Sequence, residues 1–194
     1  MQAHREFQVV TPDTLAEFQG QVLVLPSVSI LSATENEALK TFDERGGRTV
    51  ITGVTASGLV SSPRIVRISD CPSTAYLGGL QRDFAQGSQK MPEQFLQSLK
   101  QNDEILVDAP STVATNFGRV NGLPHIFVAN FGGLIPGKFA LPVPASGIRI
   151  SVPAEAGDSL MYLAFLGGTQ TLRGMRRGNR TEFILPPVER GAVA

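Results

Sequence analysis

The fold class is decided by residues 20–53, which read GQVLVLPSVSILSATENEALKTFDERGGRTVITG. Residues 22–25 are continuously apolar and are closed by Pro26, which is typical of a strand buried on both faces of a parallel sheet. Residues 32–35, SATE, form a capping box and predict the start of a helix. Residues 49–52, TVIT, supply a second strand. The sequence therefore predicts a βαβ unit and an α/β layer.

The predicted helix has a clear inner face and a clear end. Leu39 and Phe42 are three residues apart and share one face. Gly46-Gly47 follows, where a helix end needs left-handed backbone. With one good helix beside three or four strands, we expect a thin, one-sided layer. Because parallel sheets normally need cover on both faces, either the layer is truncated or another subunit completes it.

The rest of the first half gives weaker signals. We expect a short strand over residues 7–10, a helical turn over residues 12–18 and a strand over residues 65–68. Residues 92–100 predict a helix with proline in its first turn, preceded by a polar joint at residues 87–90.

The pattern changes period from about residue 104 onward. Residues 139–143 and 148–152 alternate, and residues 160–165 and 181–185 are further strand-like runs. Gly or Pro interrupts them every eight to twelve residues, as in an antiparallel sandwich. We therefore expect α/β plus all-β architecture.

Three segments follow from this change of period. Residues 1–84 form the partial α/β domain, residues 85–103 a helical connector, and residues 104–194 the antiparallel β-sandwich.

Composition excludes several classes of protein. Lysine plus arginine and aspartate plus glutamate number 17 each, so no net field attracts nucleic acid or an anionic membrane. A local cluster of arginines interrupts this balance, as a solvated hairpin tip or as a contact for an anion or partner: Arg173, Arg176, Arg177 and Arg180.

Cysteine and histidine are too scarce for a metal centre. With Cys71 alone, no internal disulfide can form, and with His4 and His125 as the two histidines we expect no metal and no cofactor. No apolar run is long enough to cross a membrane and no secretory signal is evident, so we expect a soluble protein, cytoplasmic by default.

The order of several motifs resembles one group of glycoside hydrolases. The first half resembles the β-galactosidase trimerisation domain, and the second half resembles the C-terminal β-sandwich of the same proteins. The matching stretches are VLVLP at 22–26, LS at 31–32, AL at 38–39, RGG at 45–47, TG at 52–53, HIFVANF at 125–131 and VERGAV at 188–193.

The resemblance implies an accessory region rather than a whole enzyme. It implies a partial flavodoxin-like sheet, related to class I glutamine amidotransferases, and a catalytic (β/α)8 barrel that would precede residue 1. It further implies a role in oligomerisation, so we expect a homo-oligomer and a barrel on a longer parent chain. The amidotransferase nucleophile is missing, because the matching turn at residues 53–58 has no cysteine and Cys71 falls elsewhere as an ordinary, partly buried thiol.

The residues themselves leave two alternatives open. One is a small esterase or glycosidase with Ser57 as nucleophile, His125 as base and Asp108 or Asp70 as orienting acid. Against it, the turn at Ser57 is not G-x-S-x-G and no clear helix follows. No pair of carboxylates is placed as glycoside hydrolysis requires.

The other alternative is a carbohydrate-binding module. It lacks the flat platform that sugars favour, since there is no tryptophan and Tyr76 and Tyr162 are the two tyrosines. His125 is expected to cap a strand, and Asn130 with Gly132-Gly133 is expected to form a hairpin turn.

Overall fold

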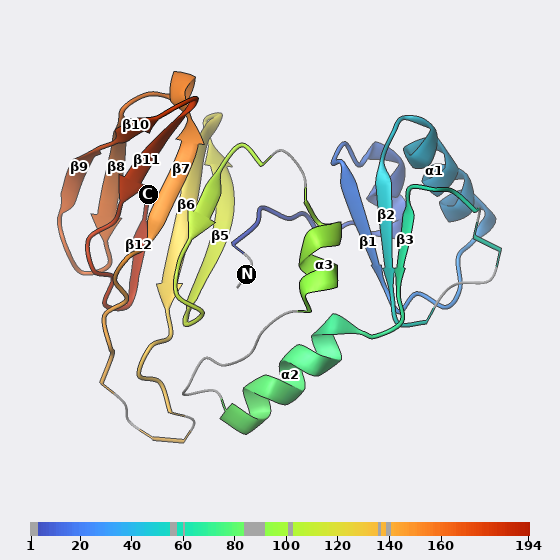
Figure 1. Cartoon of the computed structure of the whole chain (residues 1–194), viewed down its shortest axis with the longest axis horizontal. Coiled ribbons are helices and arrows are strands. Elements are labelled where there is room, and N and C mark those ends of the chain that lie inside the picture. The colour runs from blue at the N-terminus through green and yellow to red at the C-terminus, as the bar shows by residue number, and fades with distance from the viewer. Residues whose placement is uncertain are drawn as a thin grey trace. The chain divides into compact units, whose positions relative to one another are not determined.

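A computed structural model describes residues 4–54, 58–59, 61–83, 92–100, 103–135, 137–138 and 141–194. The chain divides into two compact units, each described by itself below (Figure 1). The α/β unit comprises Gln8–Gly79 and Lys90–Asn102. The sandwich unit comprises Met1–Phe7, Leu80–Gln89 and Asp103–Ala194. The N-terminal residues thus belong to the sandwich unit.

The α/β unit is built on three parallel strands in the order β1-β2-β3. They are β1 (Val22–Pro26), β2 (Arg48–Thr52) and β3 (Ile65–Ile68). Helix α1 (Ala33–Glu44) connects β1 to β2, which confirms the predicted βαβ unit.

The ends of α1 follow the predicted chemistry. The Ser32 hydroxyl accepts a hydrogen bond from the Glu35 amide at 3.2 Å, and the Glu35 carboxylate accepts one from the Ser32 amide at 2.7 Å. Gly46 has φ +94°, the left-handed backbone expected after a helix. At Gly47, a Cβ would stand 2.4 Å from the Phe42 ring, so glycine permits the close approach of helix and strand.

The sheet of the α/β unit is covered on both faces. On one face, η1 (Pro12–Glu17) and α1 enclose an apolar cluster formed by Leu15, Phe18, Leu23, Leu39 and Phe42. On the other, α3 (Glu93–Ser98) lies opposite α1 (Figure 1). Val50, which points to that second face, has 0% exposure. The expectation of a one-sided layer was therefore wrong, because a short helix distant in sequence returns to the sheet.

Two further elements of the first half differ from expectation. Residues 7–10 form no strand, since they have no ladder partner among the described residues, and Phe7 and Val9 are exposed. Helix α2 (Pro72–Asp83) was not predicted, although Pro72 is a typical first residue of a helix.

The sandwich unit contains two antiparallel sheets. The four-stranded sheet has the order β10-β11-β7-β4, and the five-stranded sheet has the order β5-β6-β12-β8-β9. The first comprises β4 (Leu106–Asp108), β7 (Arg149–Pro153), β10 (Met175–Arg177) and β11 (Arg180–Ile184). The second comprises β5 (Val113–Val120), β6 (Leu123–Asn130), β8 (Ser159–Ala164), β9 (Thr169–Arg173) and β12 (Gly191–Val193), and η2 (Ala154–Ala156) follows β7.

Both sheets contribute to one core. Ile150 and Phe183 from the four-stranded sheet join Ile126 and Tyr162 from the five-stranded sheet in a single buried cluster. The predicted mixed α/β and β-sandwich architecture is confirmed. For the run predicted at residues 139–143, residues 139–140 lie outside the described residues and 141–143 are not in a strand.

Asn130 stands at the predicted turn, which connects strands of two different sheets and so is not a hairpin, and its side chain has a further role. Its side-chain amide donates to the carbonyl oxygens of Val143 at 2.8 Å and of Val188 and Glu189 at 2.9 Å. Its side-chain oxygen accepts from the Gly132 amide at 2.8 Å. Asn130 is buried, so it satisfies backbone groups that water does not reach.

Candidate functional site

Of the triad considered from the sequence, the structure describes His125 and Asp108 and does not bring these two together. Ser57 lies outside the described residues. His125 is in β6, and its Nδ1 lies 3.0 Å from the Leu123 carbonyl oxygen. Asp108 is in β4, where it lies across from Arg149 of β7.

His125 and Asp108 also lie on different outer surfaces of the sandwich. Ile126, next to His125, and Val107, next to Asp108, both pack into the core. Because side chains alternate along a strand, His125 and Asp108 point outward from two different sheets. The hydrogen bond of His125 to the backbone agrees with its predicted capping role.

The carboxyl edge of the parallel sheet holds a thiol of unusual acidity. Cys71 stands after β3 and immediately before α2, with its Sγ 3.0 Å from the Ser73 hydroxyl. The hydrogen bond with the Ser73 hydroxyl is the largest of the causes that together lower the pKa of Cys71 to about 6, and Thr74 and Ser27 contribute in the same direction. A thiol with that pKa is largely thiolate at neutral pH and is therefore more reactive than the ordinary thiol that the sequence predicted.

Two tight backbone turns adjoin this edge. Ser27 has φ +52° after β1, and Gly53 has φ +68° after β2. A Cβ at Gly53 would stand 2.3 Å from the Ser27 hydroxyl oxygen, so only glycine fits there. The ends of β1 and β2 are thus held close together, with the amide of Ser27 donating to the Thr52 carbonyl at 2.7 Å.

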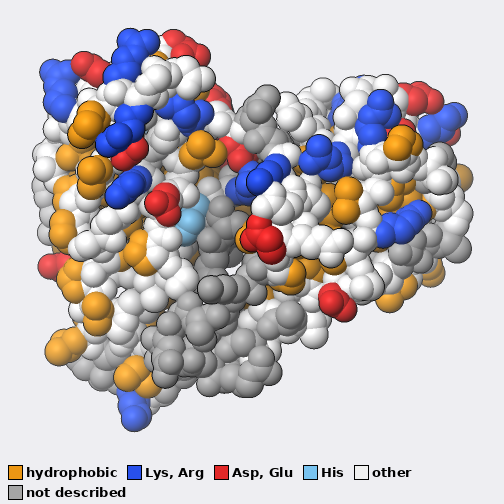
Figure 2. All heavy atoms as spheres, viewed as in Figure 1, with side chains coloured by type: hydrophobic (Ala, Val, Ile, Leu, Met, Phe, Trp, Pro, Cys, Tyr) orange, Lys and Arg blue, Asp and Glu red, His pale blue; other side chains and the backbone are white. Residues whose placement is uncertain are grey.

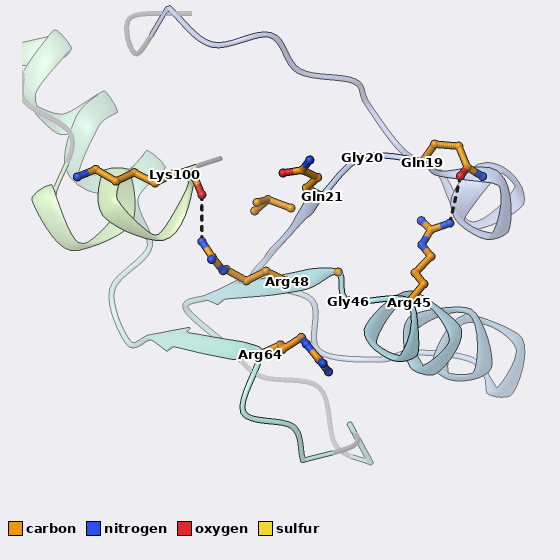
Figure 3. A pocket seen from close by; sticks show the side chains of 10 residues that line it. Gln19, Gly20, Gln21, Arg45, Gly46, Arg48, Arg64 and Lys100 are labelled. Carbon is orange, nitrogen blue, oxygen red and sulfur yellow. Dashed lines mark hydrogen bonds between the residues drawn. The ribbon is translucent and has the colours of Figure 1, made fainter. Parts of the chain in front are cut away.

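A pocket of about 430 Å³ lies at the opposite, amino edge of the same sheet (Figure 3). Four cationic residues and no acidic residue line it. The lining residues are Gln19, Gly20, Gln21, Val22, Arg45, Gly46, Gly47, Arg48, Arg64 and Lys100.

Two guanidinium groups of the pocket already donate hydrogen bonds to backbone carbonyl oxygens. Arg48 Nη1 donates to the carbonyl oxygens of Ser98 at 3.2 Å and of Lys100 at 3.1 Å. Figure 3 shows the Lys100 side chain pointing away from Arg48 while its carbonyl faces it. Arg45 donates to the Phe18 carbonyl, and its guanidinium lies 5.1 Å from the centre of the Phe42 ring.

Arg64 is held in a different way. Its Nη1 lies 3.6 Å from the Asp43 carboxylate and donates to the Asp43 carbonyl at 3.3 Å. The arginines of the pocket therefore connect the loops at the strand starts, and the charge that remains can attract an anion but supplies no acid or base for hydrolysis.

Six of the described carboxylates form ion pairs with cations. The ion pairs are Arg5–Asp103, Lys40–Glu37, Arg64–Asp43, Arg119–Glu104, Arg173–Asp158 and Arg177–Glu182. A retaining glycosidase needs two carboxyl groups about 5 Å apart that face one substrate. Each of the six pairs joins one carboxylate to one cation, so none of them supplies two facing carboxyl groups.

The arginine cluster lies on and beside the β10–β11 hairpin. Arg177 pairs with Glu182 at 3.4 Å, and Arg180 donates to the Ser151 hydroxyl at 2.8 Å and to the Glu104 carbonyl at 2.9 Å. Figure 2 shows blue side chains gathered over this part of the sandwich unit. The solvated-hairpin interpretation fits these contacts.

The described residues hold neither a candidate metal site nor a candidate membrane-spanning helix. Among the described residues, no group of three or more His, Cys, Asp or Glu side chains could hold a metal ion. Within the same residues, no helix is long and apolar enough to cross a membrane.

Sequence comparison and structure comparison give different results. No protein-family model and no curated protein matches the sequence. The structure is similar to that of alpha-L-fucosidase isoenzyme 2 from Paenibacillus thiaminolyticus, with a TM-score of 0.61, 11% identity, and 89% of this chain covered. The match spans 40% of the fucosidase chain.

Two other solved structures are similar to a lower degree. An exo-carrageenase GH42 from Bacteroides ovatus gives a TM-score of 0.36 at 11% identity, over 91% of this chain and 24% of that one. A rhamnosidase from Novosphingobium sp. PP1Y gives 0.44 at 13% identity, over 89% and 16%. The chain thus has the fold of a portion of a larger glycoside hydrolase chain, the fucosidase, and spans less than half of its length.

Proposed function

We propose that this chain is a non-catalytic accessory region of a glycoside-hydrolase-like protein, which supports a catalytic barrel and brings subunits together. The observation that supports this most strongly is the fucosidase match, because nearly the whole chain, through both units, corresponds to less than half of a larger hydrolase chain.

The chemistry of the described residues supports the same proposal. Six carboxylates are held in ion pairs with cations, and the candidate triad members His125 and Asp108 lie on separate surfaces. The resemblance of the sequence to a trimerisation domain with a flavodoxin-like sheet agrees with a supporting role, and we retain it as part of the proposal.

Two measurements test the absence of catalysis and the link to a barrel. We expect the purified chain to release no chromophore from a panel of aryl glycosides and aryl esters above the rate in buffer. Turnover that survives purification and disappears in Ser57→Ala or Cys71→Ala would overturn the proposal. We also expect antibodies against this chain to detect a natural polypeptide much longer than 194 residues. Detection of a 194-residue species alone would contradict the link to a barrel.

A further inference from the structure

We propose that the outer face of the five-stranded sheet is the surface through which two copies of this chain associate. This inference rests on the proposed role in bringing subunits together. The sequence suggested the parallel sheet as the contact between subunits. We place that contact on the five-stranded sheet of the sandwich unit instead, because the faces of the parallel sheet are covered.

The centre of this face is a row of apolar side chains on three adjacent strands. Phe127 of β6 lies across from Val193 of β12, and Val193 lies across from Leu163 of β8. Phe127 and Leu163 are 43% and 45% exposed. Their neighbours in sequence, Ile126 and Tyr162, are buried in the core, so the row lies on the outside of the sheet.

The row is extended on both sides by more exposed apolar residues. Met161 lies two residues before Leu163 in β8, and Phe165 lies two residues after it, just beyond the end of the strand. The two side chains are 70% and 62% exposed. At the other end, Val120 of β5 lies across from Leu123 of β6, and both are exposed. We call this set the apolar face: Val120, Leu123, Phe127, Met161, Leu163, Phe165 and Val193. His125 of β6 lies on the same face, between Leu123 and Phe127. An exposed patch composed mainly of apolar side chains is a mark of an interaction surface.

The backbone of the face is adapted to hold a flat aromatic side chain. A Cβ at Gly118 of β5 would stand 3.3 Å from the Phe127 ring, so the ring lies over the glycine of the neighbouring strand. The ring is on the surface because Phe127 occupies an outward position of β6, between Ile126 and Val128 of the core. An aromatic side chain with few rotamers to lose is a favourable interface residue.

A strained residue adjoins the apolar face. Leu166, next to Phe165, has φ +59° and is 88% exposed. Left-handed backbone is unfavourable for leucine, and exposure of its side chain gains nothing in an isolated molecule. Contact with a partner gives that side chain a stabilising role.

The charge pattern selects a second copy as the partner. Two outward positions of the five strands carry an ionisable side chain. Arg173 of β9 lies at the far edge, where it pairs with Asp158 at 3.2 Å, and His125 of β6 has its Nδ1 3.0 Å from the Leu123 carbonyl oxygen. Two copies can therefore place apolar face on apolar face, in a two-fold arrangement, without burying an unpaired charge. A partner with a highly charged surface would find no complementary charges on this face.

The dimensions predict a weak dimer. Strands spaced by about 4.8 Å and up to eight residues long give a face of about 20 by 25 Å. This is at the small end of specific interfaces, which bury about 800 Å² per partner. We therefore expect association in the micromolar range.

The test compares one substitution on each sheet by sedimentation velocity from about 1 to 100 µM. Met161→Glu introduces a charge on the apolar face, and Met175→Glu does so on β10, where the methionine is 57% exposed on the other sheet. We expect the unchanged chain and Met175→Glu to form dimers alike. We expect Met161→Glu to dissociate about tenfold or more readily, with an unchanged circular dichroism spectrum and melting temperature.

The outcomes separate the inference from the proposed function. If the unchanged chain dimerises and Met161→Glu dimerises equally well, the apolar face is not the interface, while an oligomerising role stands. If the unchanged chain is a monomer up to about 100 µM, both this interface and self-association of the chain are refuted. The absence of catalysis is tested separately by the substrate panel.

Discussion

The two outer faces of the sandwich differ sharply, although the same core lies between them. The four-stranded sheet presents charged residues between its apolar ones, as in the ion pair between Arg177 and Glu182. The five-stranded sheet presents the apolar face, with Phe127, Val193 and Leu163 in a row across three strands. A sandwich core needs only the inner side chains, so the outer difference is not a requirement of folding. We therefore propose different roles for the two faces, with the charged one in water and the apolar face against a second copy.

The largest expected effect distinguishes inner from outer positions. Phe183→Ala removes a buried ring from the shared core, and we expect a loss of about 3–5 kcal/mol in the free energy of unfolding. The adjacent Ile184 is 55% exposed, so Ile184→Ala should cost less than about 1 kcal/mol. Guanidinium chloride titration measures both. Equal losses would contradict the assignment of inner and outer faces.

The next effect concerns the backbone that supports the five-stranded sheet. Asn130→Ala removes the side-chain donor to the carbonyl groups of Val143 and Glu189, while the Val188 carbonyl keeps its bond from the Ala145 amide. We expect a loss of about 2–3 kcal/mol. Asn116 is a matched control, because it is exposed on β5 and its side chain accepts only from the Phe117 amide. Asn116→Ala should change the free energy of unfolding by less than about 0.5 kcal/mol. A comparable effect of both substitutions would show that Asn130 is not the support proposed.

A third substitution should change folding and association in opposite directions. Leu166→Gly removes the strain of φ +59°, but glycine loses more backbone entropy on folding, so we expect the folded chain to gain at most about 1 kcal/mol. If Leu166 contacts the second copy, the same variant should dimerise more weakly in sedimentation. Asn121→Gly is the control, since Asn121 has φ +52° but asparagine tolerates this backbone. A gain in both stability and association would break the link between Leu166 and the apolar face.

The smallest effect concerns the edge where the two sheets come together. His4 is 7% exposed, its Nδ1 lies 3.2 Å from the Thr115 hydroxyl, and burial lowers its pKa below 6.5. The folded chain therefore binds fewer protons than the unfolded chain, and stability present above pH 6.5 is lost as the pH falls through and below that value. We expect less than about 1 kcal/mol between pH 7 and pH 5. The slope should be smaller in His4→Gln, and an identical slope would rule out His4 as its source.

Local signals were sufficient for much of the fold. The apolar run at β1, the Ser32–Glu35 capping box and the glycines after α1 are contiguous in sequence, so the βαβ unit could be predicted. The alternation in β7 and the run in β11 likewise indicated the sandwich. Each depends on hydrogen bonds or periodicity within a few residues.

The candidate sites depended on contacts between distant residues. The lowered pKa of Cys71 comes in part from Ser27, which lies 44 residues earlier in the chain. The pocket arginines are occupied by carbonyl groups such as that of Ser98, which lies 50 residues from Arg48. No spacing in the sequence indicates either pairing, because both are set by which elements pack together.

The sequence by itself determined the kinds of elements, since helix caps, turn residues and apolar runs are chemically local. The tertiary structure decided which side of each strand is a surface. From the second residue of β8 to the residue after it, the sequence at 160–165 is LMYLAF, with no charged or strongly polar side chain. The period of hydrophobicity therefore does not separate inner from outer positions there. Strand pairing places Tyr162 in the core and Leu163 outside, because successive side chains point to opposite faces once the neighbouring strands are fixed.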